Sequence, residues 1–142
     1  MSIYPERPEP HLARCIPELP FEDHRGVIQP LVDAPMGGCA LINSKAGSVR
    51  ANHYHREDWH YVYVVSGEIE YHHREVGSAE PPVVERFGAG AMFHSPPMVE
   101  HAMYFPVDTS FVVLSHLSRP KEAYEEDVVR VADLTGKLET TK

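Results

Sequence analysis

The sequence has little positive charge and few cysteines. Its 142 residues carry 13 lysines and arginines against 21 aspartates and glutamates, a formal net charge of −8 at pH 7 with neutral histidines. A general binder of nucleic acid or of anionic membranes needs the opposite balance, so neither partner is expected. The two cysteines, Cys15 and Cys39, have no CxxC spacing, and we expect both to be reduced thiols.

Long hydrophobic runs are also missing. The first residues, MSIYPERPEP, lack the basic segment and the apolar core of a signal peptide, and no run is long enough to span a membrane. These absences predict a cytoplasmic protein. The length is that of one domain, and 42% hydrophobic residues are enough to fill a core.

Long helical periodicity is absent as well, and short apolar runs separated by glycines take its place. The runs cover residues 26–32, 39–43, 59–65, 68–74, 83–87, 101–105 and 110–116. Strands of this length with glycine turns between them are typical of an antiparallel sandwich or barrel. The pattern therefore predicts an all-β barrel over residues 21–118.

Both ends of the chain differ from this pattern. Residues 1–20 contain five prolines, which neither a helix nor a central strand tolerates. We expect them to form an extended arm that crosses to a neighbouring subunit in a homodimer. Residues 119–142 predict one short helix, over 121–132, followed by a polar tail.

Ten histidines are the unusual feature of the composition, and three of them are closely spaced. His53 and His55 are two residues apart, so on a strand they point to the same face. His60 follows after a short turn and shares its face with Val62 and Val64, which predicts that it looks into the interior. Buried imidazoles are costly to desolvate unless they are paired, and a divalent metal is a suitable partner.

Two segments resemble the two motifs of the cupin superfamily. The first is Gly47-x5-His53-x-His55-x4-His60-x6-Gly67, and the second is Gly90-x5-Pro96-Pro97-x3-His101. The resemblance implies a double-stranded β-helix, or jelly-roll, barrel. It also implies one divalent transition metal per chain, held by His53, His55, His60 and His101. Zinc is the first expectation, and iron, nickel, manganese and copper are the alternatives.

Three positions depart from the cupin motifs. His60 replaces a glutamate, which keeps a ligand but makes the donor set all nitrogen. Met98 replaces the second glycine of the second motif, and Phe105 replaces its asparagine. These departures bear on the charge of the site and on the geometry of one turn.

A narrower resemblance concerns cupins that act on nucleotide-linked deoxysugars. Arg50-Ala51-Asn52-His53-Tyr54-His55 is similar to their RGNHYH segment, with alanine in place of glycine. Asp23-His24-Arg25-Gly26 is similar to a segment of sugar 3,4-ketoisomerases and 3,5-epimerases. The resemblance implies a small sugar-like substrate whose diphosphate Arg25 and Arg50 bind, since guanidinium groups match phosphate oxygens.

These observations predict an isomerase or epimerase that moves a proton next to a carbonyl group. A metal held by imidazoles polarises the carbonyl oxygen, and the candidate proton acceptors are His94, Tyr63 and His73. Two alternatives stay open. One is a metal-dependent dioxygenase, because imidazole also binds iron, nickel and copper, and the other is a non-catalytic protein that binds a small ligand.

Overall fold

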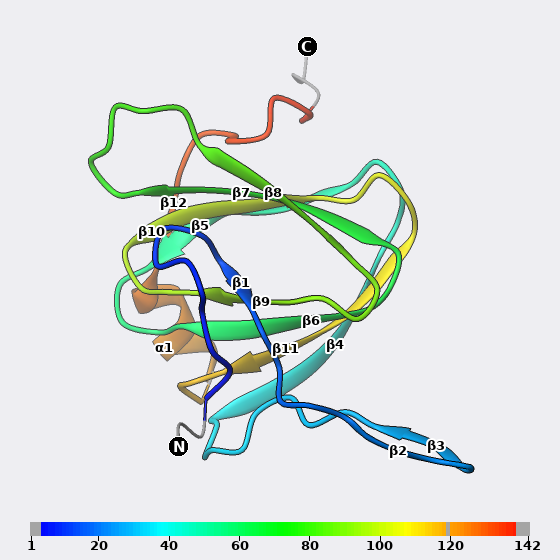
Figure 1. Ribbon diagram of the computed structural model, residues 1–142. Helices are drawn as coiled ribbons and strands as arrows, with labels where there is room; N and C mark the ends of the chain where they lie inside the picture. The colour runs from blue at the N-terminus through cyan, green and yellow to red at the C-terminus, as the bar shows by residue number, and fades with distance from the viewer. Residues whose placement is uncertain (1–3, 119, 139–142) are drawn as a thin grey trace.

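The computed structural model describes residues 4–118 and 120–138 and shows two five-stranded antiparallel sheets packed face to face (Figure 1). One sheet has the order β1-β9-β6-β11-β4 and the other has the order β12-β5-β10-β7-β8. The strands are β1 (Arg14–Cys15), β2 (Phe21–Asp23), β3 (Gly26–Ile28), β4 (Gly38–Ser44), β5 (Val49–His55), β6 (His60–Ser66), β7 (Glu68–Glu75), β8 (Val83–Gly88), β9 (Met92–Ser95), β10 (Val99–Tyr104), β11 (Thr109–Ser115) and β12 (Val128–Arg130). The predicted all-β barrel is confirmed.

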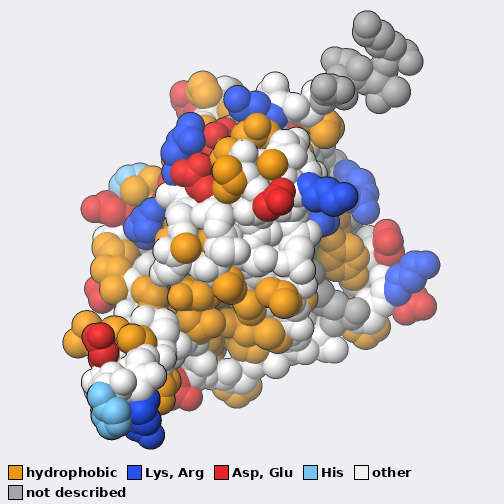
Figure 2. Space-filling model, turned by 90° about the vertical axis from the view of Figure 1, so that its right-hand side faces the viewer, with side chains coloured by type: hydrophobic (Ala, Val, Ile, Leu, Met, Phe, Trp, Pro, Cys, Tyr) orange, Lys and Arg blue, Asp and Glu red, His pale blue; other side chains and the backbone are white. Residues whose placement is uncertain are grey.

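Every apolar run predicted from residue 39 onward is a strand, within two residues at each end. The run over 26–32 is shorter than predicted, because β3 ends two residues before Pro30, which has no N–H to donate to a ladder. β3 pairs only with β2, and this hairpin projects from the barrel (Figure 1). Its Phe21, Val27 and Ile28 are 59%, 58% and 65% exposed. Figure 2 shows hydrophobic side chains gathered on the side of the molecule toward which this hairpin projects.

The two sheets bury a core of aliphatic and aromatic side chains between them. Its fully buried members are Val62, Val64, Ile69, Phe87, Phe93, Phe105 and Phe111. His60, with 6% exposure, lies on the same face of β6 as Val62 and Val64, which confirms that it looks into the interior. Phe105, the residue in place of the motif asparagine, stacks on Phe111 with ring centroids 5.5 Å apart.

The N-terminal arm packs on the barrel of its own chain, and its crossing to a neighbouring subunit stays a prediction. Arg14 and Cys15 form β1 and pair with β9. The carbonyl oxygen of Ala13 accepts the His94 N–H at 2.9 Å, and the Ala13 N–H donates to Glu85 Oε2 of β8 at 2.8 Å. Because β9 and β8 belong to opposite sheets, the arm closes the seam between them. The prolines stand before and after β1 and leave its backbone free to pair.

The C-terminal segment also differs from its prediction. The helix α1 covers only Lys121–Asp127, and the chain then pairs as β12 with the edge of β5. Val128 and Val129 are β-branched, which favours the strand. Residues 119 and 139–142 of the predicted helix and tail lie outside the described residues. Within the part that is described, no helix has the length and apolarity needed to cross a membrane.

Candidate functional site

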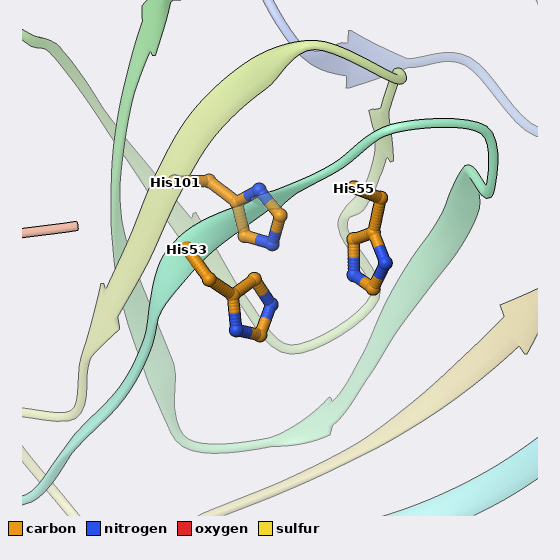
Figure 3. A group of neighbouring side chains, drawn as sticks. All are labelled: His53, His55 and His101. Atoms are coloured by element: carbon orange, nitrogen blue, oxygen red, sulfur yellow. The ribbon is translucent and has the colours of Figure 1, made fainter. Parts of the chain in front are cut away.

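Three of the predicted metal ligands meet at one end of the barrel interior. His53 and His55 come from β5, and His101 comes from β10. One potential ligand atom of each lies within 4.8 Å of the other two. Figure 3 shows the three rings converging on a common space. All three residues are at most 9% exposed, so the cluster is shielded from solvent.

The local backbone that presents these histidines is irregular. His101 pairs with His53 across the two strands, and a β-bulge follows between His101 and Ala102. On β5, Ala51 and Asn52 adopt φ angles of 74° and 56°, a left-handed conformation that costs free energy for residues other than glycine. Bulges and strained residues of this kind re-aim side chains beside functional sites.

Hydrogen bonds fix the tautomers of two of the rings. His101 Nδ1 lies 3.1 Å from the carbonyl oxygen of Val99, and His55 Nδ1 lies 2.9 Å from Asp127 Oδ2. A carbonyl or carboxylate oxygen only accepts, so each Nδ1 carries the proton. The lone pair is therefore on Nε2, which is the nitrogen that faces the cluster in Figure 3.

This donor set fits a divalent first-row transition metal. Zinc–nitrogen bonds of 2.0–2.1 Å place tetrahedral ligand atoms about 3.3 Å apart, which is within reach of nitrogens less than 4.8 Å apart. Three neutral imidazoles suit zinc, copper, iron and nickel.

His60, the fourth predicted ligand, lies beside this group. Its ring centroid is 5.5 Å from that of His55 and 5.6 Å from that of His101. The set of ligand atoms within 4.8 Å of one another contains His53, His55 and His101 but not His60. Among the described residues, the geometry therefore favours three histidines as the inner set.

His73 is the predicted proton acceptor that the fold places on the interior face. It pairs with His101 in the register of β7 and β10, so His53, His101 and His73 form a row across three neighbouring strands. Its ring lies against Tyr71 at 5.2 Å. His72 takes the opposite face and is bonded to Glu70 at 2.8 Å. Of these two neighbouring histidines, His73 is therefore the one that faces the interior.

A carboxylate that the sequence analysis missed holds His73. Glu85 Oε2 on β8 lies 2.6 Å from His73 Nε2. Burial raises the pKa of Glu85, but the hydrogen bonds from His73 and from the backbone N–H groups of Ala13 and Arg14 outweigh burial, so the pKa is lowered overall. Glu85 is therefore a carboxylate at neutral pH. The only sequence signal for it is its place on the strand after His73.

A cavity of about 480 Å³ opens near the histidine cluster, but His53, His55 and His101 are not among the residues that line it. Its lining includes Arg7, Tyr71, His73, Arg74 and His94. The Tyr71 hydroxyl donates to Ser95 Oγ at 3.1 Å, and that oxygen lies 3.4 Å from His101 Nδ1. Tyr71 therefore connects the cavity wall to the cluster.

His94, another predicted proton acceptor, lines the same cavity from the side of the arm. Its Nδ1 lies 3.3 Å from Arg7 Nη1. Burial, with a further contribution from the positive charge of Arg7, lowers the pKa of His94 to about 4. His94 is therefore a neutral imidazole at pH 7.

Tyr63 does not reach the site, which corrects its assignment as a proton acceptor. Side chains alternate along β6, and Val62 and Val64 point inward, so Tyr61 and Tyr63 point outward. Tyr63 packs there against the outer cluster of Cys15, Tyr61 and Met92.

The two arginines predicted to bind a diphosphate also lie away from the cavity. Arg25 is on the projecting hairpin, where it forms an ion pair with Asp23 at 2.6 Å. Arg50 donates to Ser44 Oγ at 2.7 Å and to the carbonyl oxygen of Asn43 at 3.2 Å. Neither is among the residues that line the cavity.

Comparison with known proteins identifies the fold. No protein-family model and no curated protein sequence matches the chain, but solved structures do. A 3,4-ketoisomerase from Helicobacter canadensis matches with a TM-score of 0.68 at 14% identity, over 80% of this chain and 86% of that one.

Two further structures carry bound ligands. A mutant of the 3,4-ketoisomerase QdtA from Thermoanaerobacterium thermosaccharolyticum, in complex with TDP-4-keto-6-deoxyglucose, has a TM-score of 0.66 at 13% identity, over 80% and 83% of the two chains. The epimerase RmlC from Legionella pneumophila, in complex with dTDP-4-keto-L-rhamnose, has a TM-score of 0.67 at 17% identity, over 85% and 72%. The chain thus has the cupin fold, in a form similar to that of nucleotide-sugar ketoisomerases and epimerases.

Proposed function

We propose that this chain is an enzyme that moves a proton at the carbon next to a carbonyl group of a small sugar-like metabolite. The observation that carries the proposal is the convergence of three buried imidazoles on the interior face that also carries His73, which is bonded to the carboxylate of Glu85 and lines a cavity. An electrophilic site and a proton acceptor side by side are what proton transfer next to a carbonyl requires.

In this proposal His53, His55 and His101 hold one divalent transition metal, with zinc as the first expectation. When bound, the metal supplies Lewis acidity that polarises a carbonyl oxygen. The protein supplies a buried donor set in which the Nδ1 atoms of His55 and His101 are already bonded. Such bonds hold each ring in the orientation that presents Nε2.

His73 takes the proton. Its Nε2 is bonded to Glu85, so Nδ1 is the nitrogen that accepts. A carboxylate bonded to one ring nitrogen orients the imidazole and stabilises the cation that forms when the other nitrogen is protonated. The N–H of Ala13 in turn holds Glu85, so the N-terminal arm contributes to the site.

The substrate class follows from the cavity and from the relatives. A volume of about 480 Å³ falls within the range of small-molecule sites. Two structures that the fold resembles were solved with keto sugars linked to a nucleoside diphosphate. Arg25 and Arg50 lie away from the cavity, so a diphosphate bound there would meet Arg7 and Arg74, which line it.

Metal analysis of purified protein tests the site. We expect one equivalent of metal in the wild type and less than about a tenth of that in His53→Ala/His55→Ala and in His101→Ala. His72→Ala is the matched control, because His72 is as buried as the ligands, at 6% exposure, but occupies the opposite face of its strand. Full metal in the double variant contradicts the site. Iron or copper in the wild type would favour the dioxygenase alternative.

Proton exchange tests the reaction. TDP-4-keto-6-deoxyglucose, the ligand of one relative, serves as the probe. In D₂O we expect the wild type to exchange the protons beside the keto group, as followed by NMR, and His73→Asn and Glu85→Gln to slow the exchange by about 100-fold or more. His72→Asn is expected to keep the wild-type rate. Absence of exchange with the metal-loaded wild type contradicts the reaction on this class of substrate.

A further inference from the structure

The carboxylate of Asp127 touches the metal site from a part of the chain that neither motif covers. Asp127 is the last residue of α1, and its Oδ2 lies 2.9 Å from Nδ1 of His55. Seventy-two positions separate the two residues in the sequence. The contact is shielded, since the side chains are 2% and 13% exposed. In Figure 3 the other ring nitrogen of His55 faces His53 and His101.

The same carboxylate also organises the loop that joins His55 to His60. Asp127 Oδ1 accepts the backbone N–H of Glu57 at 2.7 Å, and the Asp58 N–H lies 3.3 Å from Oδ2. The carbonyl oxygen of Asp127 accepts the Arg56 N–H at 2.9 Å. Three successive loop residues are therefore bound to one residue of the C-terminal segment.

Asp127 is close enough to Asp58 and His55 to form a second cluster of potential metal ligands. Its oxygens, however, already accept from two backbone N–H groups and from His55. Asp58 Oδ1 accepts the N–H groups of Trp59 and Leu117, both at 2.9 Å. Because these oxygens are already bonded, we interpret the cluster as a structural contact that fixes the loop after His55 and the His55 ring, and not as a second metal site.

We infer that Asp127 is a positioning residue for the metal site. It accepts the Nδ1–H of His55, fixes the tautomer with the lone pair on Nε2, and holds the ring toward His53 and His101. A carboxylate behind a metal-bound histidine also makes the imidazole a better donor. The inference rests on the proposed metal site. If Asp127 positions His55, then tight binding of the metal requires the C-terminal segment to be in place, because Val128, the residue after Asp127, pairs with His55 on β5.

Zinc titration of the full chain, stripped with a chelator, tests the inference. We expect Asp127→Ala to weaken zinc binding by about 10- to 100-fold and Asp127→Asn to weaken it less. Asp133→Asn is the matched control. Asp133 lies in the same C-terminal segment and bonds Asn52 at 3.0 Å and Thr135 at 2.8 Å, without a bond to a histidine of the site. Wild-type affinity in Asp127→Ala overturns the inference.

A second readout does not depend on metal. Nitrogen NMR of the metal-free protein reports which ring nitrogen of His55 carries the proton. We expect the Nδ1–H form in the wild type and in Asp133→Asn, and a shift toward Nε2–H in Asp127→Ala, which has no acceptor at this position. An unchanged tautomer in folded Asp127→Ala overturns the inference. Failure of the wild type to bind zinc removes the proposed metal site, and the tautomer measurement still decides whether Asp127 orients the ring.

Discussion

At the scale of single residues, His60 is the position where the sequence departs most from the cupin motifs. Its ring lies 5.5 Å from that of His55, outside the inner group of ligand atoms. We expect His60→Ala to lower zinc affinity by less than about tenfold, whereas His101→Ala abolishes stoichiometric binding. Zinc titration of both variants measures the difference. Equal losses would show that His60 is a full ligand.

The same position sets the charge of the site. If His60 approaches the metal, a glutamate there keeps a ligand but lowers the net charge of the loaded site by one. His60→Glu is therefore expected to bind zinc and to bind a small anion such as azide more weakly than the wild type. Zinc titration measures the affinity for the metal, and spectroscopy of the cobalt-substituted protein during an azide titration measures the affinity for the anion.

His94 makes the stability depend on pH. Burial and the charge of Arg7 lower its pKa from 6.5 to about 4 in the folded chain. As the pH falls from 6.5 to 4, the unfolded chain takes up a proton at this residue and the folded chain does not, so the folded state loses stability. At pH 5 the loss is about 1–2 kcal/mol.

Urea unfolding of chelator-treated protein at pH 7.5 and pH 5 checks this expectation. His94→Gln should lose less stability between the two pH values than the wild type. His11→Gln is the control, because the His11 side chain is 74% exposed. Equal pH dependence of the wild type and His94→Gln would contradict the role given to His94.

At the scale of elements, two departures from the family segments fall on left-handed residues. Met98 has a φ angle of 58° in the turn before β10, and Ala51 has a φ angle of 74° in β5. Glycine adopts this conformation without the penalty of about 1 kcal/mol that other residues bear. Met98 is 47% exposed, whereas Ala51 packs against the core.

We therefore expect Met98→Gly to raise the free energy of unfolding by about 0.5–1 kcal/mol. Ala51→Gly should change it little, because the loss of a core methyl group, about 0.8 kcal/mol, offsets the relief of strain. Urea unfolding of the two variants measures both. Destabilisation by Met98→Gly would show that its side chain makes contacts that matter more than the backbone.

The elements that the sequence predicts are those whose signal is local. The spacing of His53 and His55 predicts a strand with both rings on one face, and the structure has that strand. β9 has only four residues between glycines and the Pro96-Pro97 turn, too few to show an alternation. Val128–Arg130 continues the helical segment in sequence and becomes a strand only because the edge of β5 is there to pair with it.

The missed site residues are those whose partners lie far along the chain. Glu85 and Asp127 hold His73 and His55 across 12 and 72 positions. No spacing rule relates such pairs, because they are brought together by the closing of the sheets. The assignment of Tyr63 was open to sequence reasoning, since the alternation that turns His60 inward turns Tyr63 outward.

At the scale of the whole molecule, the arm and the projecting hairpin bear on the expected homodimer. The arm pairs with its own β9, whereas the hairpin exposes Phe21, Val27 and Ile28. A two-stranded hairpin is marginally stable alone, and exposed apolar clusters of this kind mark contact surfaces. We therefore expect the hairpin face, and not the arm, to form the contact between two copies.

A shortened chain that starts at Phe21 lacks the arm but keeps the hairpin, so it separates the contribution of the arm from that of the hairpin. It removes β1 with the buried Ala13 and Cys15 and leaves Glu85 without the N–H of Ala13. We expect a loss of about 2–4 kcal/mol in the free energy of unfolding, from lost burial and from a carboxylate bond that is no longer made. Since the hairpin stays intact, light scattering should give the same oligomeric state for the truncated and the full chain. A change from dimer to monomer would show instead that the arm crosses between subunits, and unchanged stability would show that the seam closes without it.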